Sequence, residues 1–155
     1  MSANDTIDFW FTVGSTYTYL TVSRLHEVEA ATGIRFRWHP FNARASRVAV
    51  LGEMEGWCPN YVRASYRRWF VEGKEVGAEP NLSESLSEIG QDPDRVIVAA
   101  NAETVGRAYD DNTNEARRLN IFGSPSFVVG GEVFWGDDRL DDAIAWHTNG
   151  TLRPT

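Results

Sequence analysis

The chain has few cysteines and no long apolar run, and each absence excludes a class of protein. Among 155 residues there is one cysteine, Cys58, so no intrachain disulfide can form and no pair of thiols is present for disulfide exchange. No segment approaches the roughly 20 consecutive apolar residues that a membrane-spanning helix needs. Residues 1–6 contain no basic residue followed by an apolar run. We therefore expect no signal peptide and a cytoplasmic protein.

Positive charge is also scarce. There are 15 Lys and Arg residues against 22 Asp and Glu residues, which gives a formal net charge of −7. With no cluster of basic residues, we expect neither a nucleic-acid partner nor binding to an anionic membrane surface. The three histidines are scattered, without carboxylates at the spacing of a metal site, so we expect no metal. At 42% apolar and 24% charged residues, residues 1–155 are predicted to form a single domain with its own core.

A predicted β-hairpin organises the C-terminal part of the chain. Two short apolar runs, 127–129 and 133–135, flank Gly130-Gly131. Paired glycines readily adopt the positive φ that a tight hairpin turn requires. Ser124-Pro125 precedes the first strand, and the sequence leaves open whether that peptide bond is cis or trans.

The N-terminal part predicts a β-α-β unit. Residues 7–13 are β-branched and aromatic, as in a strand, and 34–39 alternate between apolar and polar residues up to Pro40. Between them, apolar residues recur at helical spacing over 17–31, with Ser15 or Thr16 in the N-cap region and Gly33 as the C-terminal signal. Such a unit normally places its two strands in parallel through a right-handed crossover.

The middle of the chain is helical in pattern. An apolar segment at 45–54 is ambiguous, whereas helices are predicted at 61–72, 82–89, from Pro93 to Asn101 or beyond, and 113–119. Asp137 and Asp138 then open a last helix after the hairpin. The order β-α-β, helices, β-hairpin, helix predicts an α/β fold in which helices cover one sheet.

This order resembles the DsbA-like form of the thioredoxin fold, with a helical insert at approximately residues 44–105. Residues 11–20, Phe-Thr-Val-Gly-Ser-Thr-Tyr-Thr-Tyr-Leu, resemble the Ser-Pro-x-Ser-Tyr-Leu opening of the 2-hydroxychromene-2-carboxylate isomerases and kappa-class glutathione transferases. Trp38-His39-Pro40-Phe41 resembles the W-R-P-F that follows in those proteins. The most specific part of the resemblance lies in three further segments, 112–116, 121–129 and 134–140.

Two features depart from the family pattern. Thr16 stands where the family usually has proline after the serine. The chain is also shorter than a typical member, and the loss falls after Phe41, in the helical insert. In the family, that insert builds much of the acceptor pocket and contacts the far end of glutathione. The resemblance therefore leaves the acceptor substrate open.

Ser15 is the predicted catalytic residue. It lies at a strand-to-helix turn, where free N–H groups and the helix dipole favour an anion. The resemblance implies that its hydroxyl donates to the thiolate of glutathione and keeps that thiol ionised near neutral pH. The alternative is a serine that only caps the helix, and both roles can coexist. Ser15 and Thr18 replace the two cysteines of disulfide oxidoreductases, which argues against disulfide exchange.

The resemblance implies further glutathione contacts around the hairpin, made by Ser124, Pro125, Trp135, Asp137 and Asp138. With a cis bond, the N–H and C=O of Ser124 would pair with the cysteinyl unit of glutathione as a short extra strand. Asp138 would meet the γ-glutamyl ammonium, and Trp135 would line the thiol pocket. The alternatives are a trans proline that protects a sheet edge, helix capping by Asp137, and an ordinary core position for Trp135.

The resemblance thus implies a glutathione-dependent isomerase that acts on an electrophilic intermediate of aromatic degradation. The thiolate would add to a carbon of the substrate, bond rotation or ring reopening would follow, and glutathione would leave unchanged. Two alternatives stay open: a kappa-type glutathione transferase, whose adduct is the product, and a non-catalytic thioredoxin-like module that binds a peptide or partner. The resemblance is also compatible with a homodimer.

Overall fold

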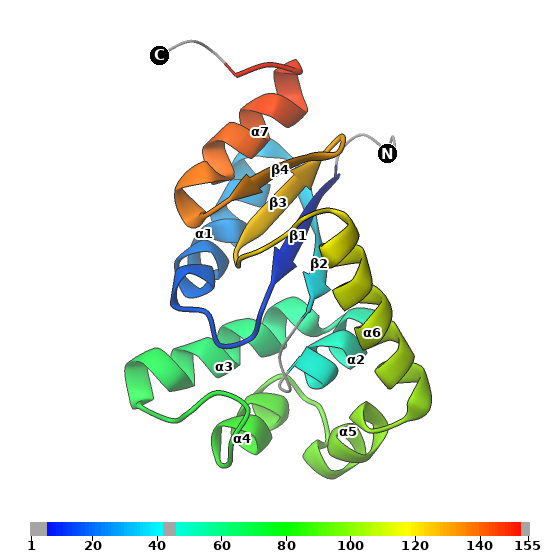
Figure 1. Ribbon diagram of the computed structural model, residues 1–155. Helices are drawn as coiled ribbons and strands as arrows, with labels where there is room; N and C mark the ends of the chain where they lie inside the picture. Colours follow the sequence, from blue (N-terminus) through cyan, green and yellow to red (C-terminus); the bar gives the residue numbers. More distant parts are fainter. Residues whose placement is uncertain (1–5, 42–45, 153–155) are drawn as a thin grey trace.

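A four-stranded mixed sheet forms the centre of the protein. The structure is a computed structural model that describes residues 6–41 and 46–152. The strand order is β2-β1-β3-β4 (Figure 1). Its strands are β1 (Thr6–Phe11), β2 (Arg35–Pro40), β3 (Ser126–Val129) and β4 (Glu132–Trp135). The β1–β2 pair is parallel, whereas the β1–β3 and β3–β4 pairs are antiparallel, which confirms the predicted β-α-β unit and hairpin.

Helix α1 (Thr16–Thr32) connects β1 to β2. Its N-cap is Ser15, whose Oγ accepts a hydrogen bond from the N–H of Thr18 at 3.3 Å. Its C-cap is Gly33, whose φ of 76° lies in the left-handed region that glycine adopts without a Cβ clash. Strand β1 ends two residues before the predicted strand end, because the chain after Phe11 already forms the turn into α1.

Between the β-α-β unit and the hairpin, the described residues form five helices: α2 (Ser46–Glu55), α3 (Cys58–Glu72), α4 (Asn81–Glu88), α5 (Pro93–Ala100) and α6 (Glu103–Arg118). Helices α2 to α5 gather at the lower end of the sheet in Figure 1. The ambiguous segment is therefore a helix, whereas α6 begins ten residues before the helix predicted at 113–119. The insert at 44–105 stays a prediction, and its first two residues lie outside the described residues. Residues 1–5, where we expect no signal peptide, also lie outside them.

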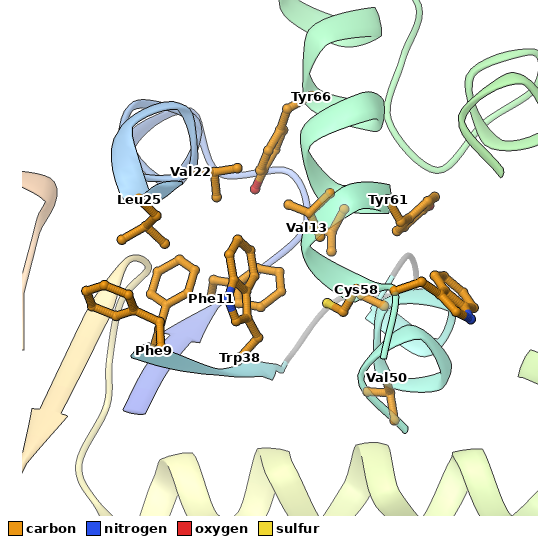
Figure 2. Close-up of a cluster of buried hydrophobic side chains, with 14 of the residues drawn as sticks. Phe9, Phe11, Val13, Val22, Leu25, Trp38, Val50, Cys58, Tyr61 and Tyr66 are labelled. Carbon is orange, nitrogen blue, oxygen red and sulfur yellow. The ribbon is translucent and has the colours of Figure 1, made fainter. Parts of the chain in front are cut away.

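The two faces of the sheet bury different cores. On one face, aromatic side chains of the strands pack against α1 and α7 (Leu140–Asn149). Phe9 stacks on Phe11 with ring centroids 5.1 Å apart and on Phe127 at 5.5 Å, and Figure 2 shows Phe9 and Phe11 near Leu25 of α1. On the other face, Trp10 and Val128 pack against the end of α6 through Ala116. This alternation follows from the two-residue period of strands.

A 3₁₀ turn, η1 (Asp137–Arg139), joins the hairpin to α7. The acidic pair Asp137-Asp138 therefore lies in this turn, and α7 itself begins at Leu140. Within residues 6–41 and 46–152, no helix is long and apolar enough to cross a membrane.

A buried polar cluster holds α3 and α4 together. Asn81 is fully buried, and its Nδ2 donates to the carbonyls of Ser65 at 2.9 Å and Lys74 at 2.8 Å. Its Oδ1 accepts from the hydroxyls of Ser65 and Ser85, each at 2.9 Å. We call these four residues the Asn81 cluster. Every polar atom of the Asn81 side chain is thus satisfied within the protein, as burial requires.

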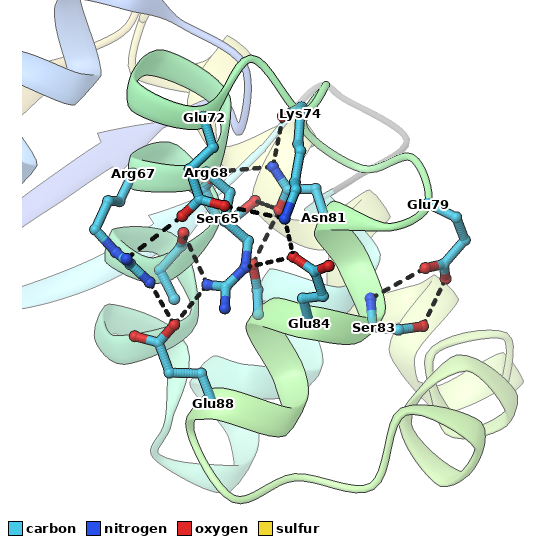
Figure 3. Close-up of polar contacts among 12 residues, drawn as sticks. Ser65, Arg67, Arg68, Glu72, Lys74, Glu79, Asn81, Ser83, Glu84 and Glu88 are labelled. Carbon is cyan, nitrogen blue, oxygen red and sulfur yellow. Dashed lines mark hydrogen bonds and ion pairs between the residues drawn. The ribbon is translucent and has the colours of Figure 1, made fainter.

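Ion pairs surround the Asn81 cluster (Figure 3). Arg68, nearly buried, contacts Glu84 at 3.2 Å and Glu88 at 2.6 Å. Lys74 contacts Glu84 at 2.5 Å and Glu72 at 3.0 Å. Hydrogen bonds from Lys74 and Arg68 hold the pKa of Glu84 below its ordinary value. These pairs lie at the surface of α3 and α4, where each contributes little to stability on its own.

Candidate functional site

The hydroxyl of Ser15 joins the start of α1 to the loop before β3. Its Oγ donates to the carbonyl oxygen of Ser124 at 3.0 Å and accepts from the N–H of Thr18. The predicted helix-cap role is therefore present in the structure. The hydroxyl hydrogen points at a protein carbonyl, so donation to a ligand would require it to rotate away from Ser124.

The peptide bond between Ser124 and Pro125 is cis, which decides the alternative that the sequence left open. The Oγ of Ser124 accepts from the N–H of Thr12 at 2.8 Å and lies 2.5 Å from Oγ1 of Thr18. The carbonyl of Pro125 accepts from the N–H of Gly136 at 2.9 Å. Among the described residues, the N–H of Ser124 has no acceptor. We call Ser15, Thr18 and Ser124 the Ser124 cluster.

A pocket of about 570 Å³ opens beside the Ser124 cluster. It brings together all five residues predicted to bind glutathione. The pocket is lined by Tyr17, Leu20, Ser124, Pro125, Trp135, Gly136, Asp137, Asp138 and Arg139. Ser15 does not line it, but its hydroxyl contacts the carbonyl of Ser124, which does.

Exposed aromatic and aliphatic side chains border this pocket. Trp135 is 53% exposed, and its ring lies 4.9 Å from that of Phe122, which is 77% exposed. Trp135 is therefore a pocket wall, and the alternative of an ordinary core position is wrong. A Cβ at Gly123 would lie 2.1 Å from the indole Nε1, so the indole can lie here only because residue 123 is glycine. Tyr17 and Leu20 are exposed on the α1 side of the pocket.

The two aspartates of η1 have different surroundings. The carboxylate of Asp137 accepts from the hydroxyl of Thr21 at 2.7 Å and from Nε of Arg24 at 3.2 Å, and Arg24 also donates to the Asp137 carbonyl. Asp137 therefore fastens η1 to α1. Asp138 is exposed and has no ion pair among the described residues, while its neighbour Arg139 pairs with Asp142 at 2.6 Å. Asp138 is thus the carboxylate at the pocket that is free to meet a cation.

Tyr66 lies on the helix predicted at 61–72, and the sequence did not identify a role for it at the site. The side chain is fully buried, yet its hydroxyl donates to the carbonyl of Thr12 at 2.9 Å and accepts from the N–H of Gly14 at 3.3 Å. Burial raises the pKa of Tyr66 to about 12, so the hydroxyl stays protonated at neutral pH. The available signal was a tyrosine on an otherwise apolar helix face, because a buried phenol usually finds a hydrogen-bond partner.

The other candidates lie away from the pocket. Cys58 is buried, and burial raises the pKa of its thiol, which makes it a poor nucleophile. His39 lies 2.8 Å from Asp8, on the sheet face opposite the aromatic core. Within the described part of the chain, no group of three or more His, Cys, Asp or Glu residues could hold a metal ion.

The sheet order, the cis-proline before β3 and the helix start facing it define a protein of the thioredoxin class. A family comparison makes this more specific. Residues 42–144, more than half of the chain, match the model of the DSBA-like thioredoxin domain. The chain belongs to that family.

Individual relatives agree with this assignment. The chain is 21% identical to 2-hydroxychromene-2-carboxylate isomerase of Sphingobium xenophagum, over 88% of this chain and 94% of that protein. A solved 2-hydroxychromene-2-carboxylate isomerase has a TM-score of 0.74 at 17% identity, with 90% of this chain and 93% of that chain covered. The cytosolic disulfide reductase DsbM from Pseudomonas aeruginosa, solved with GSH, has a TM-score of 0.69 at 16% identity, with 92% and 96% covered. The structural likenesses establish the shared fold, and together the comparisons support an enzyme of the DsbA-like thioredoxin fold.

Proposed function

We propose that the protein is a cytoplasmic, glutathione-dependent isomerase similar to 2-hydroxychromene-2-carboxylate isomerase. One observation carries the proposal: the Ser15 hydroxyl contacts the carbonyl beside a cis-proline, at the edge of a pocket that all five predicted glutathione-binding residues line. The likeness to a named isomerase along nearly the whole chain supports the reaction type.

In this proposal glutathione lies along the pocket in an extended conformation. Its cysteinyl unit pairs with the N–H of Ser124, which has no acceptor among the described residues, in the manner of an added strand. Its γ-glutamyl ammonium meets the carboxylate of Asp138. The thiol then lies at the start of α1, where the N–H groups of Thr16 and Tyr17 have no intrahelical acceptor and favour a negative charge.

The proposed reaction uses the thiolate as a nucleophile that is returned at the end. Its electron pair forms a C–S bond to an electrophilic carbon of an unsaturated substrate, and the double-bond electrons move onto the conjugated carbonyl. The resulting single bond rotates, the double bond forms again, and the C–S bond breaks to release the thiolate. No atoms are gained or lost. Ser15 contributes by rotating its hydroxyl from the Ser124 carbonyl to the thiolate.

Isothermal titration with reduced glutathione tests the proposal. We expect saturable binding, weakened with an analogue that lacks the γ-glutamyl amine, and glutathione-dependent isomerisation of 2-hydroxychromene-2-carboxylate followed by ultraviolet absorbance. A product that contains covalently bound glutathione by mass spectrometry would instead identify a transferase. Absence of binding at millimolar glutathione would contradict both readings.

A non-catalytic binding module is the second candidate, and one observation favours it. The hydroxyl hydrogen of Ser15 is directed at the Ser124 carbonyl and not into the pocket. Such a module would bind glutathione without lowering the pKa of its thiol. Binding without turnover, together with an unshifted thiol pKa, would therefore select this candidate.

A further inference from the structure

The turn that carries Ser15 is held from two opposite sides. From the cis-proline loop, the Oγ of Ser124 accepts from the N–H of Thr12 at 2.8 Å. From helix α3, the hydroxyl of Tyr66 donates to the carbonyl of Thr12 at 2.9 Å and accepts from the N–H of Gly14 at 3.3 Å. The same Thr12 carbonyl accepts from the N–H of Ser15 at 3.3 Å. Tyr66 therefore bonds both sides of the turn that ends at Ser15.

Tyr66 is itself firmly placed. Its ring contacts those of Tyr19 at 6.1 Å, Phe70 at 6.0 Å and Trp69 at 6.4 Å between centroids. Figure 2 shows it between α1 and α3, with its hydroxyl directed at the coil that follows β1. Because the neighbouring rings enclose the Tyr66 ring, its hydroxyl is held in one position, from which it bonds to the backbone of the turn.

Among the described residues of the middle segment, Tyr66 is the one whose side chain bonds to the backbone of the turn from Thr12 to Ser15. No described residue of α2 to α6 lines the pocket, whose walls come from α1, the cis-proline loop and the segment after β4. The helices of the middle segment therefore shape no part of the pocket surface. Their hydrogen bonds to the turn that carries Ser15 are those of the Tyr66 hydroxyl on α3, with the carbonyl of Thr12 and the N–H of Gly14.

We propose that Tyr66 is a positioning residue, which fixes the conformation of the Ser15 turn and so the direction in which Ser15 presents its hydroxyl to a bound thiol. The second half of this proposal rests on the proposed glutathione binding, whereas the first half concerns the protein alone. A merely structural tyrosine would contribute to global stability without affecting the order of this turn.

Tyr66→Phe tests the proposal, because it removes the hydroxyl and keeps the ring. Tyr61→Phe is the matched control: Tyr61 is fully buried on the same helix, and its hydroxyl has no hydrogen-bond partner among the described residues. Figure 2 shows it on the other side of α3, away from the turn. Urea unfolding of both variants gives the change in global stability against which local effects are compared.

The first readout is amide hydrogen exchange at Thr12, whose N–H bonds to the Oγ of Ser124 and not to Tyr66. We expect exchange about tenfold faster in Tyr66→Phe than in Tyr61→Phe after correction for global stability, the size of one lost hydrogen bond. The second readout is the ultraviolet absorbance of the bound thiolate against pH. We expect the thiol pKa to rise in Tyr66→Phe and to stay unchanged in Tyr61→Phe, with glutathione affinity similar in both.

Equal exchange rates in the two variants would overturn the proposal. If the wild-type protein binds glutathione as the thiolate, a thiol pKa in Tyr66→Phe equal to the wild-type value would overturn it as well. If the wild-type protein binds no glutathione, the proposed function fails, and the exchange rates alone decide whether Tyr66 orders the turn. The two failures are therefore distinguishable.

Discussion

The hydrogen bonds of the Asn81 cluster and of the Ser124 cluster join neutral amide, hydroxyl and backbone groups, but the two clusters differ in their exposure to solvent. Asn81, Ser65 and Ser85 are fully buried, and each bond of the Asn81 amide ends on protein. In the Ser124 cluster, Thr18 is fully buried, whereas Ser15 and Ser124 are partly exposed beside a pocket. A saturated, enclosed cluster can contribute only to stability. A half-open one can exchange a protein partner for a ligand at little cost.

Asn81→Ala is expected to have the largest effect on stability. It removes four hydrogen bonds and leaves the hydroxyls of Ser65 and Ser85 buried without their shared acceptor. We expect a loss of about 3 kcal/mol in the free energy of unfolding, measured by urea denaturation, with unchanged glutathione affinity of the folded protein. Asn101→Ala, at an exposed amide on α5's end, is the control and should cost less than about 0.5 kcal/mol. Equal losses would contradict the comparison.

Ser15→Ala should have a smaller effect on stability and a larger effect on bound glutathione than Asn81→Ala. Loss of the N-cap is expected to cost about 1 kcal/mol of stability. The pKa of the bound glutathione thiol should rise by about 1 to 2 units, the size of a hydrogen bond to a charged group. Thiolate absorbance against pH measures this rise. Ser23→Ala, which removes an exposed hydroxyl from the same helix, should leave the thiol pKa where it is in the wild-type protein. A thiol pKa common to all three proteins would remove Ser15 from the mechanism.

Asp138→Asn should weaken glutathione binding about tenfold without a measurable change in stability, since it removes an exposed carboxylate that has no ion pair among the described residues. The analogue without the γ-glutamyl amine should bind both proteins equally. Asp141→Asn is the control, because this aspartate is also exposed and lies one turn further on, where it pairs with Arg24 at 4.0 Å. Should both variants weaken binding to the same extent, the effect would reflect net charge and not a contact with the ammonium.

The smallest effect is expected around Glu84. The hydrogen bond from Lys74 and that from Arg68 lower its pKa below 4.5 in the folded protein. Its stabilising contribution is therefore fully present above pH 4.5 and is lost as the pH falls through the folded value. We expect the melting temperature to fall on acidification below about pH 4.5, and to fall less in Glu84→Gln. Glu103→Gln, in an exposed pair with Arg107, serves as control. Superimposable acid profiles for Glu84→Gln and the wild-type protein would show that the ion pairs around the Asn81 cluster are screened by solvent.

Local patterns predicted the parts of the fold whose partners are close in sequence. The β-branched and aromatic residues at 7–13 predicted β1, and the alternation at 34–39 predicted β2. Gly130-Gly131 predicted the hairpin, whose second strand ends at the pocket residue Trp135. The start of α6 was missed because its first turns are polar and contain Gly106, so the apolar period there is weak. The helix is nevertheless formed, since Val105 and Gly106 pack inside the protein.

Partner choice across the chain could not be predicted from such patterns. Tyr66 bonds a residue 54 positions away, and Arg24 bonds Asp137 across 113 positions. No local sequence pattern at Tyr66 or Arg24 identifies the residue to which it bonds. The resemblance singled out five of the nine residues that line the pocket. It did not indicate that Asp137 is hydrogen-bonded to Thr21 while Asp138 has no ion pair among the described residues, nor that the Ser15 hydroxyl is directed at Ser124.

Cys58, the sole cysteine, is the first residue of α3 and is buried, and burial raises the pKa of its thiol. The folded protein therefore presents no thiol that oxidised glutathione can reach. Any thiolate absorbance or mixed disulfide seen with the native protein must then arise from an added thiol and not from the polypeptide. The absorbance of a glutathione thiolate can therefore be measured on the wild-type protein, without first replacing a cysteine.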